Sequence, residues 1–403
     1  MVSGKGLAGI ILFALLVLLV TSVSPIFTFE TGHPFEGPDI FNPYRNYVDS
    51  LGWKRANFHT HTRVKGPLNE CEEWPEEVLE DLEKFGYDIV TFSNHNELTE
   101  HPRSSELQVN VYEHGYNLFK YHKLVFGSDD VNHFDNLLPL LTSQRQWQLD
   151  MLGADADFIQ LNHPFRTNNT SEGEMSKLEG YRIMELDSGV TTEQDYWDWA
   201  LSAGHYSFAL ANDDLHYPDR SGKIAVRCNW LNCASATYKD IKACLLDGCY
   251  WCMRVPDYGD GDWDVKYEMN RHLPMVDTIG LKTDTVFMCL DRPAEKIVVT
   301  GQGHATLYEC YDTDKVEYKM LPSDPYARLT AYFADGAVIY SNPFARYDSS
   351  REDTPYHEPS HTVNLPLTIL FNLLVLALIC GVIYLFVKKL FGKKRRNDVN
   401  FVQ

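Results

Sequence analysis

The chain has 403 residues and a formal net charge of −20 at pH 7, and its apolar content is ordinary for a folded protein. Residues 388–403 hold six Lys or Arg side chains against one Asp, so the rest of the chain is more acidic still. A body of this charge repels polyanions, so we expect no nucleic acid polymer as a partner, although bound metal ions would still allow a small anionic substrate.

Two long apolar runs lie near the ends of the chain. Residues 7–23 contain no charged side chain but are short for a transmembrane helix, so this run is either a retained anchor or a cleaved signal peptide. Residues 363–387 are long enough to span a membrane and lead into the basic residues 388–403. Because basic segments stay in the cytoplasm, we predict a membrane protein with both termini cytoplasmic and the acidic body outside.

The chain between these runs divides into four segments. Residues 24–50 and 349–362 are polar or rich in proline and are expected to be tethers. Residues 51–256 alternate short apolar strands with helical patterns, which is typical of an α/β protein whose sheet is either a barrel or doubly wound. Residues 257–348 contain short β-type runs separated by turns, and we predict a small β-sandwich-like domain there.

The individual elements are predicted from apolar periodicity. In the α/β segment, helices are expected at 75–85, 143–152, 193–202 and 238–247. Strands of that segment are expected at 88–93, 124–127, 158–161, 182–186 and 207–211. In the β-rich segment, strands are expected at 286–290, 296–300, 305–310, 316–320, 327–333 and 338–340.

Side chains that bind metals follow several of these strands. His59 and His61 come after a short apolar approach, and alternate residues of a strand point to the same side, so both imidazoles can face one ion. Residues at the C-terminal ends of barrel strands converge on one face. Imidazoles and carboxylates without thiolates suit zinc, manganese or iron. The later strands are followed by His95, Asp129, His133, His163, Asp214 and His216.

A single histidine at such a place is more often a loop residue or a satisfied polar residue than a ligand. One H-x-H pair is also common by chance. Five strand ends in succession that carry His or Asp are not well explained in that way, and this succession is the observation that favours a metal site.

Six short motifs, in their order and spacing, resemble the PHP (polymerase and histidinol phosphatase) domain family of metal-dependent phosphoesterases. The resemblance covers roughly residues 51–255 and implies an α/β fold, a distorted seven-stranded (β/α) barrel, with about two or three divalent ions per chain. The motifs are Asn57–Thr62 (NFHTHT), Ser93–Asn96 (SNHN), Gly127–Asp129 (GSD), Asn132–Asp135 (NHFD), Asn162–Pro164 (NHP) and Asp214–His216 (DLH).

Carried onto these motifs, the resemblance implies three metal positions. His59, His61 and Asp214 would hold one ion, and Asp129 would bridge it to a second ion held by His133 and His163. His95 and His216 would hold the third. Glu70 is the candidate for an acidic ligand that the family places soon after its first motif.

The chain departs from the family pattern at Asp129, where the family has glutamate, and at Asn94, where it has aspartate. An intact site predicts hydrolysis of a small or membrane-associated phosphoester, in a soluble molecule, a lipid or a glycan, with Arg166 as a clamp for the phosphate. Arg166 could instead form a surface ion pair. The departures motivate an alternative, a catalytically weakened binding or scaffold protein at the cell surface, and a third interpretation is a metal hydrolase that acts on another bond.

Overall fold

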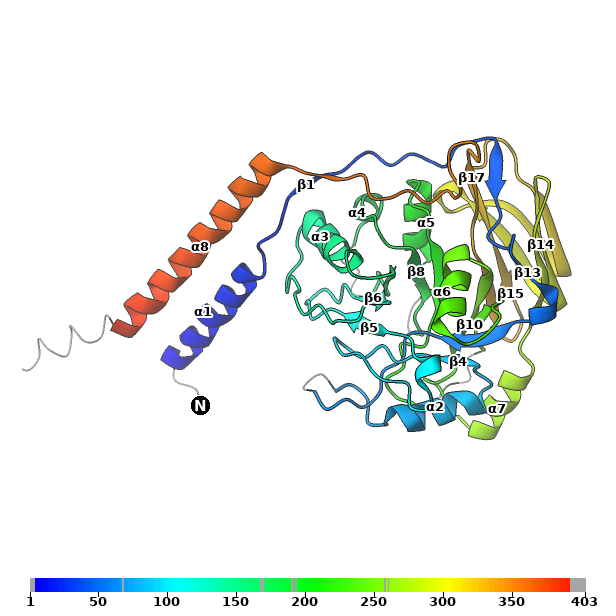
Figure 1. Cartoon of the computed structure of the whole chain (residues 1–403), viewed down its shortest axis with the longest axis horizontal. Helices are drawn as coiled ribbons and strands as arrows, with labels where there is room; N and C mark the ends of the chain where they lie inside the picture. Colours follow the sequence, from blue (N-terminus) through cyan, green and yellow to red (C-terminus); the bar gives the residue numbers. More distant parts are fainter. Residues whose placement is uncertain are drawn as a thin grey trace, which may run out of the picture.

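A computed structural model describes residues 4–391, apart from positions 67–68, 167–169, 190–191, 193, 257–258 and 260. It is a mixed α/β body from which two helices at the chain ends, α1 (Gly4–Val20) and α8 (Leu365–Phe391), extend together to one side (Figure 1). The helices of the body are α2 (Pro75–Lys84), α3 (Thr142–Gly153), α4 (Glu172–Met175), α5 (Gln194–Ser202), α6 (Tyr238–Asp247) and α7 (Trp263–Arg271), with short 3-10 turns at Asp49–Leu51, Ser105–Leu107 and Gln302–His304.

Seven strands between β3 and β9 surround the predicted site, and they belong to two sheets. β3 pairs in parallel with β4, whereas β5 to β9 form a second sheet that is antiparallel from β5 to β7 and parallel from β7 to β9. Single bridges, Thr60–Leu215 and His95–Glu113, join the sheets. Among the described residues, the contacts of β4 with β5 and of β9 with β3 are thus single bridges and not ladders, so a closed seven-stranded barrel stays a prediction. The seven strands are β3 (Lys54–Asn57), β4 (Ile89–Val90), β5 (Val111–His114), β6 (Lys123–Phe126), β7 (Phe158–Leu161), β8 (Ile183–Asp187) and β9 (Phe208–Ala211).

Helices and strands predicted between residues 75 and 247 are present, with differences only at their ends, whereas β5 was not predicted. Helix α2 shows which sequence signals allow such helices to be predicted. Pro75 occupies its first turn, the Glu77 carboxylate accepts a hydrogen bond from the Trp74 N–H at 2.8 Å, and Lys84 lies in the last turn. Its buried face consists of Val78, Leu79 and Leu82, at the spacing of an amphipathic helix.

The β-rich segment continues the sheet of β3 instead of forming a separate sandwich. The strand order is β12-β13-β15-β16-β11-β10-β3-β4, so this sheet crosses the predicted boundary at residues 256–257. Trp251 of β11 and Ile339 of β16 belong to one buried apolar cluster, which packs both parts together. The strands are β10 (Arg227–Leu231), β11 (Tyr250–Arg254), β12 (Val276–Lys282), β13 (Thr285–Gly301), β14 (Ala305–Lys319), β15 (Tyr326–Tyr332), β16 (Val338–Ser341) and β17 (Phe344–Tyr347).

The predicted tethers, 24–50 and 349–362, run along the body and pair with each other and with it. β1 (Phe27–Thr28) pairs with β18 (Thr362–Val363), and β2 (Asp39–Phe41) pairs with β17. Gly37 has a φ of +137°, and a Cβ there would lie 2.1 Å from the carbonyl oxygen of Tyr347, so this approach requires glycine. The tethers therefore hold both chain ends against the body.

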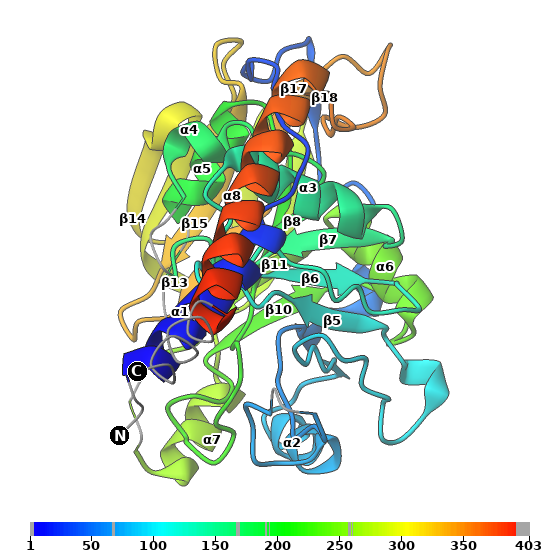
Figure 2. The same cartoon turned by 90° about the vertical axis from the view of Figure 1, so that its left-hand side faces the viewer.

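Helices α1 and α8 lie side by side (Figures 1 and 2). Among the described residues, α8 is the one helix long and apolar enough to cross a membrane, and the apolar helix Leu7–Val20 is shorter. The Ile26 N–H donates to Thr368 Oγ1 at 2.8 Å, which joins the chain after α1 to the start of α8. Both predicted apolar segments are thus helical, although only one has spanning length. The predicted basic tail lies outside the described residues from position 392 onward.

Candidate metal centre

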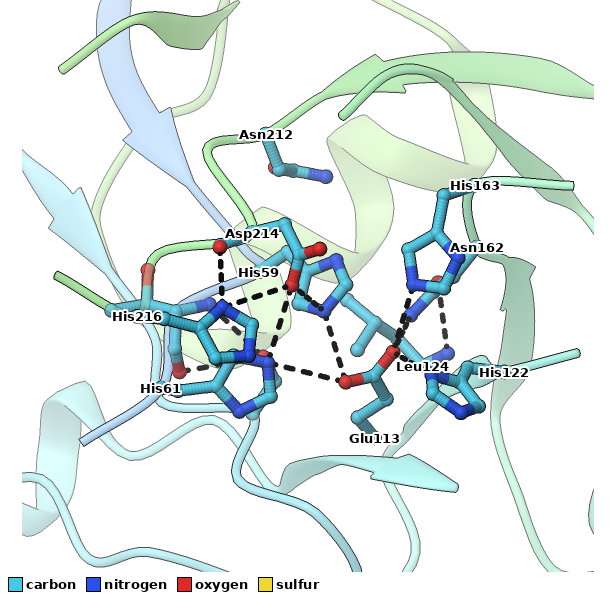
Figure 3. A network of polar contacts seen from close by, with 12 residues as sticks. His59, His61, Glu113, His122, Leu124, Asn162, His163, Asn212, Asp214 and His216 are labelled. Atoms are coloured by element: carbon cyan, nitrogen blue, oxygen red, sulfur yellow. Dashed lines mark hydrogen bonds and ion pairs between the residues drawn. The ribbon is translucent and has the colours of Figure 1, made fainter. Parts of the chain in front are cut away.

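Glu113, in β5, is at the centre of a buried group of histidines (Figure 3). Its carboxylate oxygen Oε2 lies 3.2 Å from Nε2 of His59 and 3.2 Å from Nε2 of His61. The same oxygen lies 3.1 Å from Nε2 of His95. Three imidazoles from two strand ends therefore converge on one carboxylate oxygen.

The second oxygen of Glu113 faces two further imidazoles. Oε1 lies 3.0 Å from Nδ1 of His122 and 3.2 Å from Nε2 of His163. The Asn162 side-chain amide donates to the same oxygen at 3.0 Å. Figure 3 shows the carboxylate between these residues on one side and His59 and His61 on the other. This is the placement of a carboxylate that bridges two cations.

Asp214 supplies a second carboxylate to the His59–His61 side. Its Oδ1 lies 3.2 Å from Nε2 of His59 and 3.4 Å from Nε2 of His61. Asp214 adopts a left-handed backbone with φ +49°. The neighbouring Asp213 is buried and accepts hydrogen bonds from the backbone N–H groups of residues 225–227, which holds this turn in place. The strained backbone of Asp214 is thus supported by its neighbour.

Glu70 and His216 form the outer edge of the cluster. Glu70 Oε2 lies 3.0 Å from Nε2 of His95 and 3.2 Å from Nε2 of His216. Hydrogen bonds from His216 and His95 hold the pKa of Glu70 well below its usual range. His61, Glu70 and His95 bring three donor atoms close enough to share one cation.

Glu185, in β8, orients His59 rather than competing for its metal-facing nitrogen. Glu185 Oε1 lies 2.9 Å from His59 Nδ1, and Oε2 accepts the His163 backbone N–H at 3.1 Å. With Nδ1–H donating to Glu185, the other ring nitrogen of His59 carries a lone pair toward Glu113 and Asp214. A carboxylate behind a histidine is the usual support of a metal-binding imidazole.

The charges of the cluster are strongly coupled. Burial alone would raise the pKa of Glu113, but His95, His59 and His122 outweigh it and hold that pKa well below its usual value. Burial would lower the pKa of His59, but Glu113, Glu185 and Asp214 raise it. Burial lowers the pKa of His122 to about 4, so this ring stays neutral at neutral pH. A divalent cation would therefore compete with a proton for Nε2 of His59, because an imidazole binds a metal only through an unprotonated nitrogen.

The residues present fit divalent cations. Three buried donor atoms, His59 Nε2, His61 Nε2 and Asp214 Oδ1, have no hydrogen-bond partner. They lie within 4.8 Å of one another, together with a Glu113 oxygen. Buried polar atoms are almost always satisfied, so their convergence calls for a shared partner. Neutral imidazoles and carboxylates are ligands for zinc, manganese or iron.

Most of the predicted ligands meet in this cluster. His59, His61, Glu70, His95, His163, Asp214 and His216 all lie within it. Asp129 and His133 do not. Asp129 is exposed and accepts a hydrogen bond from Asn110 at 3.1 Å. Asp129 and His133 line a separate pocket. Glu113 and His122 occupy the places that the motif comparison gave to Asp129 and His133.

Three residues of the cluster were missed from the sequence, namely Glu113, His122 and Glu185. The segment around Glu113 alternates apolar and polar residues, as a strand does, and His122 directly precedes the apolar run of β6. These signals were available in the sequence. Glu185 lies inside a continuous buried strand, where nothing in the local pattern distinguishes it.

Arg166 points into the same site. Its guanidinium contacts the Asp214 carboxylate, so it is not the surface ion pair that the sequence left open. The side chain is partly exposed and lines a pocket with Glu70, His95, Glu113 and Lys120. The Arg166 guanidinium, which is positively charged and has several N–H donors, thus lies beside the candidate metal positions.

Comparisons with known proteins find limited similarity. The sequence matches no protein-family model, and no curated protein is similar to it. Among solved structures, the chain is similar to a two-domain protein containing a predicted PHP-like metal-dependent phosphoesterase from Bacteroides vulgatus, with a TM-score of 0.37 and 13% identity over 78% of this chain and 100% of that chain. It is also similar to the lesion-specific endonuclease PfuEndoQ from Pyrococcus furiosus, with a TM-score of 0.35 and 13% identity over 48% of this chain and 56% of that chain. These scores are too low to carry an argument, so the function is argued from the site itself.

Proposed function

We propose that this protein is a metal-dependent phosphoester hydrolase. The observation that carries the proposal is the position of Glu113, whose two oxygens face separate groups of imidazoles. Paired cations bridged by a carboxylate are typical of enzymes that cleave phosphate esters. The order of the motifs around His59, His95, His163 and Asp214 supports the same class.

The residues of the cluster have distinct proposed roles in metal binding, phosphate binding and positioning. His59, His61 and Asp214 would hold one cation, and His61, Glu70 and His95 offer another position at the edge of the cluster. Glu113 would bridge the first cation to a second one near His122 and His163, which its other oxygen faces. When bound, the ions supply Lewis acidity and a nucleophilic water at neutral pH. Arg166 binds and orients the phosphate through its planar guanidinium. Glu185 keeps His59 in the required tautomer.

The features that motivated a weakened scaffold protein have structural explanations. Asn94 is fully engaged with Thr62 and Thr99, at 2.8 and 2.7 Å, so it supports a loop instead of a metal ligand. Asp129 is outside the cluster, and Glu113 provides a full-length glutamate at the centre. Neither departure therefore weakens the site.

The test is hydrolysis of a chromogenic phosphomonoester by the full chain after chelation and after return of Mn²⁺ or Zn²⁺. We expect turnover that requires metal and about two or more bound ions per chain. A panel with a phosphodiester, a DNA oligonucleotide and an amide would assign the bond that is cleaved. No turnover together with fewer than about two ions per chain would favour the scaffold interpretation.

We also propose a location. Helix α8 would anchor the chain in a membrane, with α1 beside it, both termini in the cytoplasm and the acidic body outside. The substrate would be a small phosphoester, either soluble or part of a lipid or glycan. Proteolysis of sealed vesicles that contain the protein would test this topology, because only an outward-facing body is cleaved without detergent.

A further inference from the structure

The pocket at Glu113 opens beside a group of exposed apolar side chains. Tyr116 and Lys120, in the loop between β5 and β6, line the pocket. The loop before α3 lies next to this one and reads LLPLL over residues 137–141. The exposed side chains, which we call the apolar rim, are Tyr116 (37% exposed), Leu118 (65%), Leu140 (64%) and Leu141 (37%).

Hydrogen bonds join the two loops of the apolar rim. The Leu118 N–H donates to the Leu137 carbonyl at 2.9 Å. The buried Asp135 carboxylate accepts the Tyr116 N–H at 2.6 Å and the Gln148 side-chain amide at 2.7 Å. Single exposed leucines are ordinary on a soluble surface. Here the bonds of Tyr116 and Leu118 hold the two loops that carry four exposed apolar residues next to each other, and such a gathering favours an interaction surface.

The rim-bearing loop and the first turn of α3 contact the chain where α1 ends. The Gln144 side-chain amide donates to the Ser22 carbonyl at 2.9 Å, and the Asn136 amide donates to the Thr21 carbonyl. Figure 1 places α3 on the side of the body that faces α1 and α8, and Figure 2 looks onto that side. The apolar rim is therefore continuous with the point where the apolar helices leave the body.

We propose that the apolar rim rests in the interface of the bilayer that holds α8 and presents the pocket to the phosphate of a lipid head group. This inference rests on the proposed hydrolysis and names the source of its substrate. Leucines supply apolar area, and Tyr116 suits the interface, where one end of a ring is apolar and the other wet. Lys120 and Arg166, on the pocket side, attract an anionic head group.

Fluorescence quenching tests the rim without using activity. The full chain with Cys380→Ser would carry Leu140→Cys labelled with bimane and be reconstituted in vesicles that contain lipids with brominated acyl chains. Leu321→Cys is the matched control, because Leu321 is 51% exposed in the turn after β14, on the β-rich part of the body. The Cys380→Ser parent gives the blank. We expect strong quenching at position 140 and little at 321, and equal quenching would overturn the proposal.

Kinetics tests the source of the substrate. Leu118→Asp and Leu140→Asp should lower kcat/KM for phosphatidic acid in the same bilayer by about tenfold or more and leave a soluble phosphomonoester unaffected. Leu321→Asp should change neither. Wild-type protein that cleaves only the soluble ester, or rim variants that affect both substrates equally, would overturn the inference. Absence of cleavage of both esters would refute the proposed hydrolysis. The quenching experiment would still show whether the apolar rim contacts the bilayer.

Discussion

Glu113 has no ordinary structural role for a buried carboxylate. A structural Glu satisfies its two oxygens with a few donors, yet this one faces five imidazoles. Two of these rings, His61 and His122, supply no positive charge near neutral pH, since burial lowers the pKa of His61 and lowers that of His122 to about 4. Bound metal cations would supply the positive charge that the buried Glu113 carboxylate needs. Substitution of Glu113 is therefore the most direct test of the metal site.

Glu113→Gln keeps the shape of the side chain and removes its charge. We expect fewer than about two bound ions per chain and turnover reduced more than about a hundredfold, beyond what loss of a supporting residue costs. Elemental analysis of the purified protein and hydrolysis of a chromogenic phosphoester measure the two effects. Circular dichroism would confirm that the variant is folded.

Asp129→Asn is the matched control, because Asp129 is the acid that the motif comparison placed at the centre. It is exposed, and it contacts Asn110 rather than a histidine of the cluster. We expect normal metal content and turnover in this variant. Loss of metal in Asp129→Asn with retention in Glu113→Gln would restore the motif-based assignment.

Arg166 is expected to act on the substrate and not on the metals. Arg166→Ala should raise KM for a phosphomonoester by about tenfold, because the guanidinium provides charge-assisted hydrogen bonds to phosphate. Arg166→Lys should recover only part of the loss, since lysine keeps the charge but not the planar fork. Metal content should stay at the wild-type level in both. Loss of metal would show instead that Arg166 positions Asp214, which it contacts.

At the scale of elements, the sequence was informative where periodicity is strong and local. Helix α2 combines capping, charge at both ends and an apolar face, and it was predicted. Strand β5 has four residues, pairs antiparallel with β6 and touches β4 only through the His95–Glu113 bridge. The β5–β6 pair is a local hairpin, but the contacts of Glu113 with His59 and His95 are non-local, so the sequence could not show that Glu113 lies next to His59. The motif comparison therefore assigned the bridging carboxylate to Asp129, in the Gly127–Asp129 motif, and not to Glu113.

The same limit explains the β-rich segment. Strands were predicted across most of it, but β12 and β17 were missed, and β13 and β14 are each one long strand where two short strands were expected. The strand partners were not predicted, because pairing of β11 with β16 joins residues far apart in the chain. The tethers were expected to be extended, and their pairing of β1 with β18 also depends on non-local contacts. Ligands that follow strongly apolar strands, such as His163 and Asp214, could therefore be found from the sequence, whereas the placement of Glu113 beside His59 depends on a long-range contact.

His361 makes the docking of the second tether dependent on pH. Burial lowers its pKa, but hydrogen bonds and charges from Asp150 and Glu179, at 2.8 and 3.2 Å, outweigh burial and raise it to about 9. An unfolded histidine has a pKa of about 6.5. The stabilisation is thus fully present below pH of about 6.5 and is lost as pH rises through about 9.

His361→Gln should therefore lower the Tm by a few degrees near pH of about 6 and change it little above about 10, because the lost charged hydrogen bonds contribute about 1–3 kcal/mol. Thermal unfolding of the full chain in detergent, followed by tryptophan fluorescence, measures this difference. His357→Gln is the control, since that side chain is 62% exposed. A difference that persisted at high pH would show that packing, and not charge, holds the tether.

At the scale of the whole molecule, strand ends from both sheets meet in one cluster. β3 and β4 bring His59, His61 and His95 from one sheet, while β5 and β7 bring Glu113 and His163 from the other. Among the described residues, the backbone pairing between these sheets near the site consists of single bridges. Cations held by ligands from both sheets would therefore act as a cross-link of the body, and metal affinity becomes part of its stability.

Removal of metal should consequently lower the Tm of the whole body. Ions at about 100 times their Kd would stabilise the folded state by about 2.7 kcal/mol, so chelation should lower the Tm by several degrees, and Zn²⁺ or Mn²⁺ should restore it. Ca²⁺ should restore it less, because it prefers oxygen ligands and the cluster is rich in imidazole. Glu113→Gln should respond weakly to both treatments, because the bridging carboxylate that links the two sheets through metal is lost. An unchanged Tm after complete metal removal would mean that apolar packing alone holds the sheets together, and the cations would then serve only the chemistry of the site.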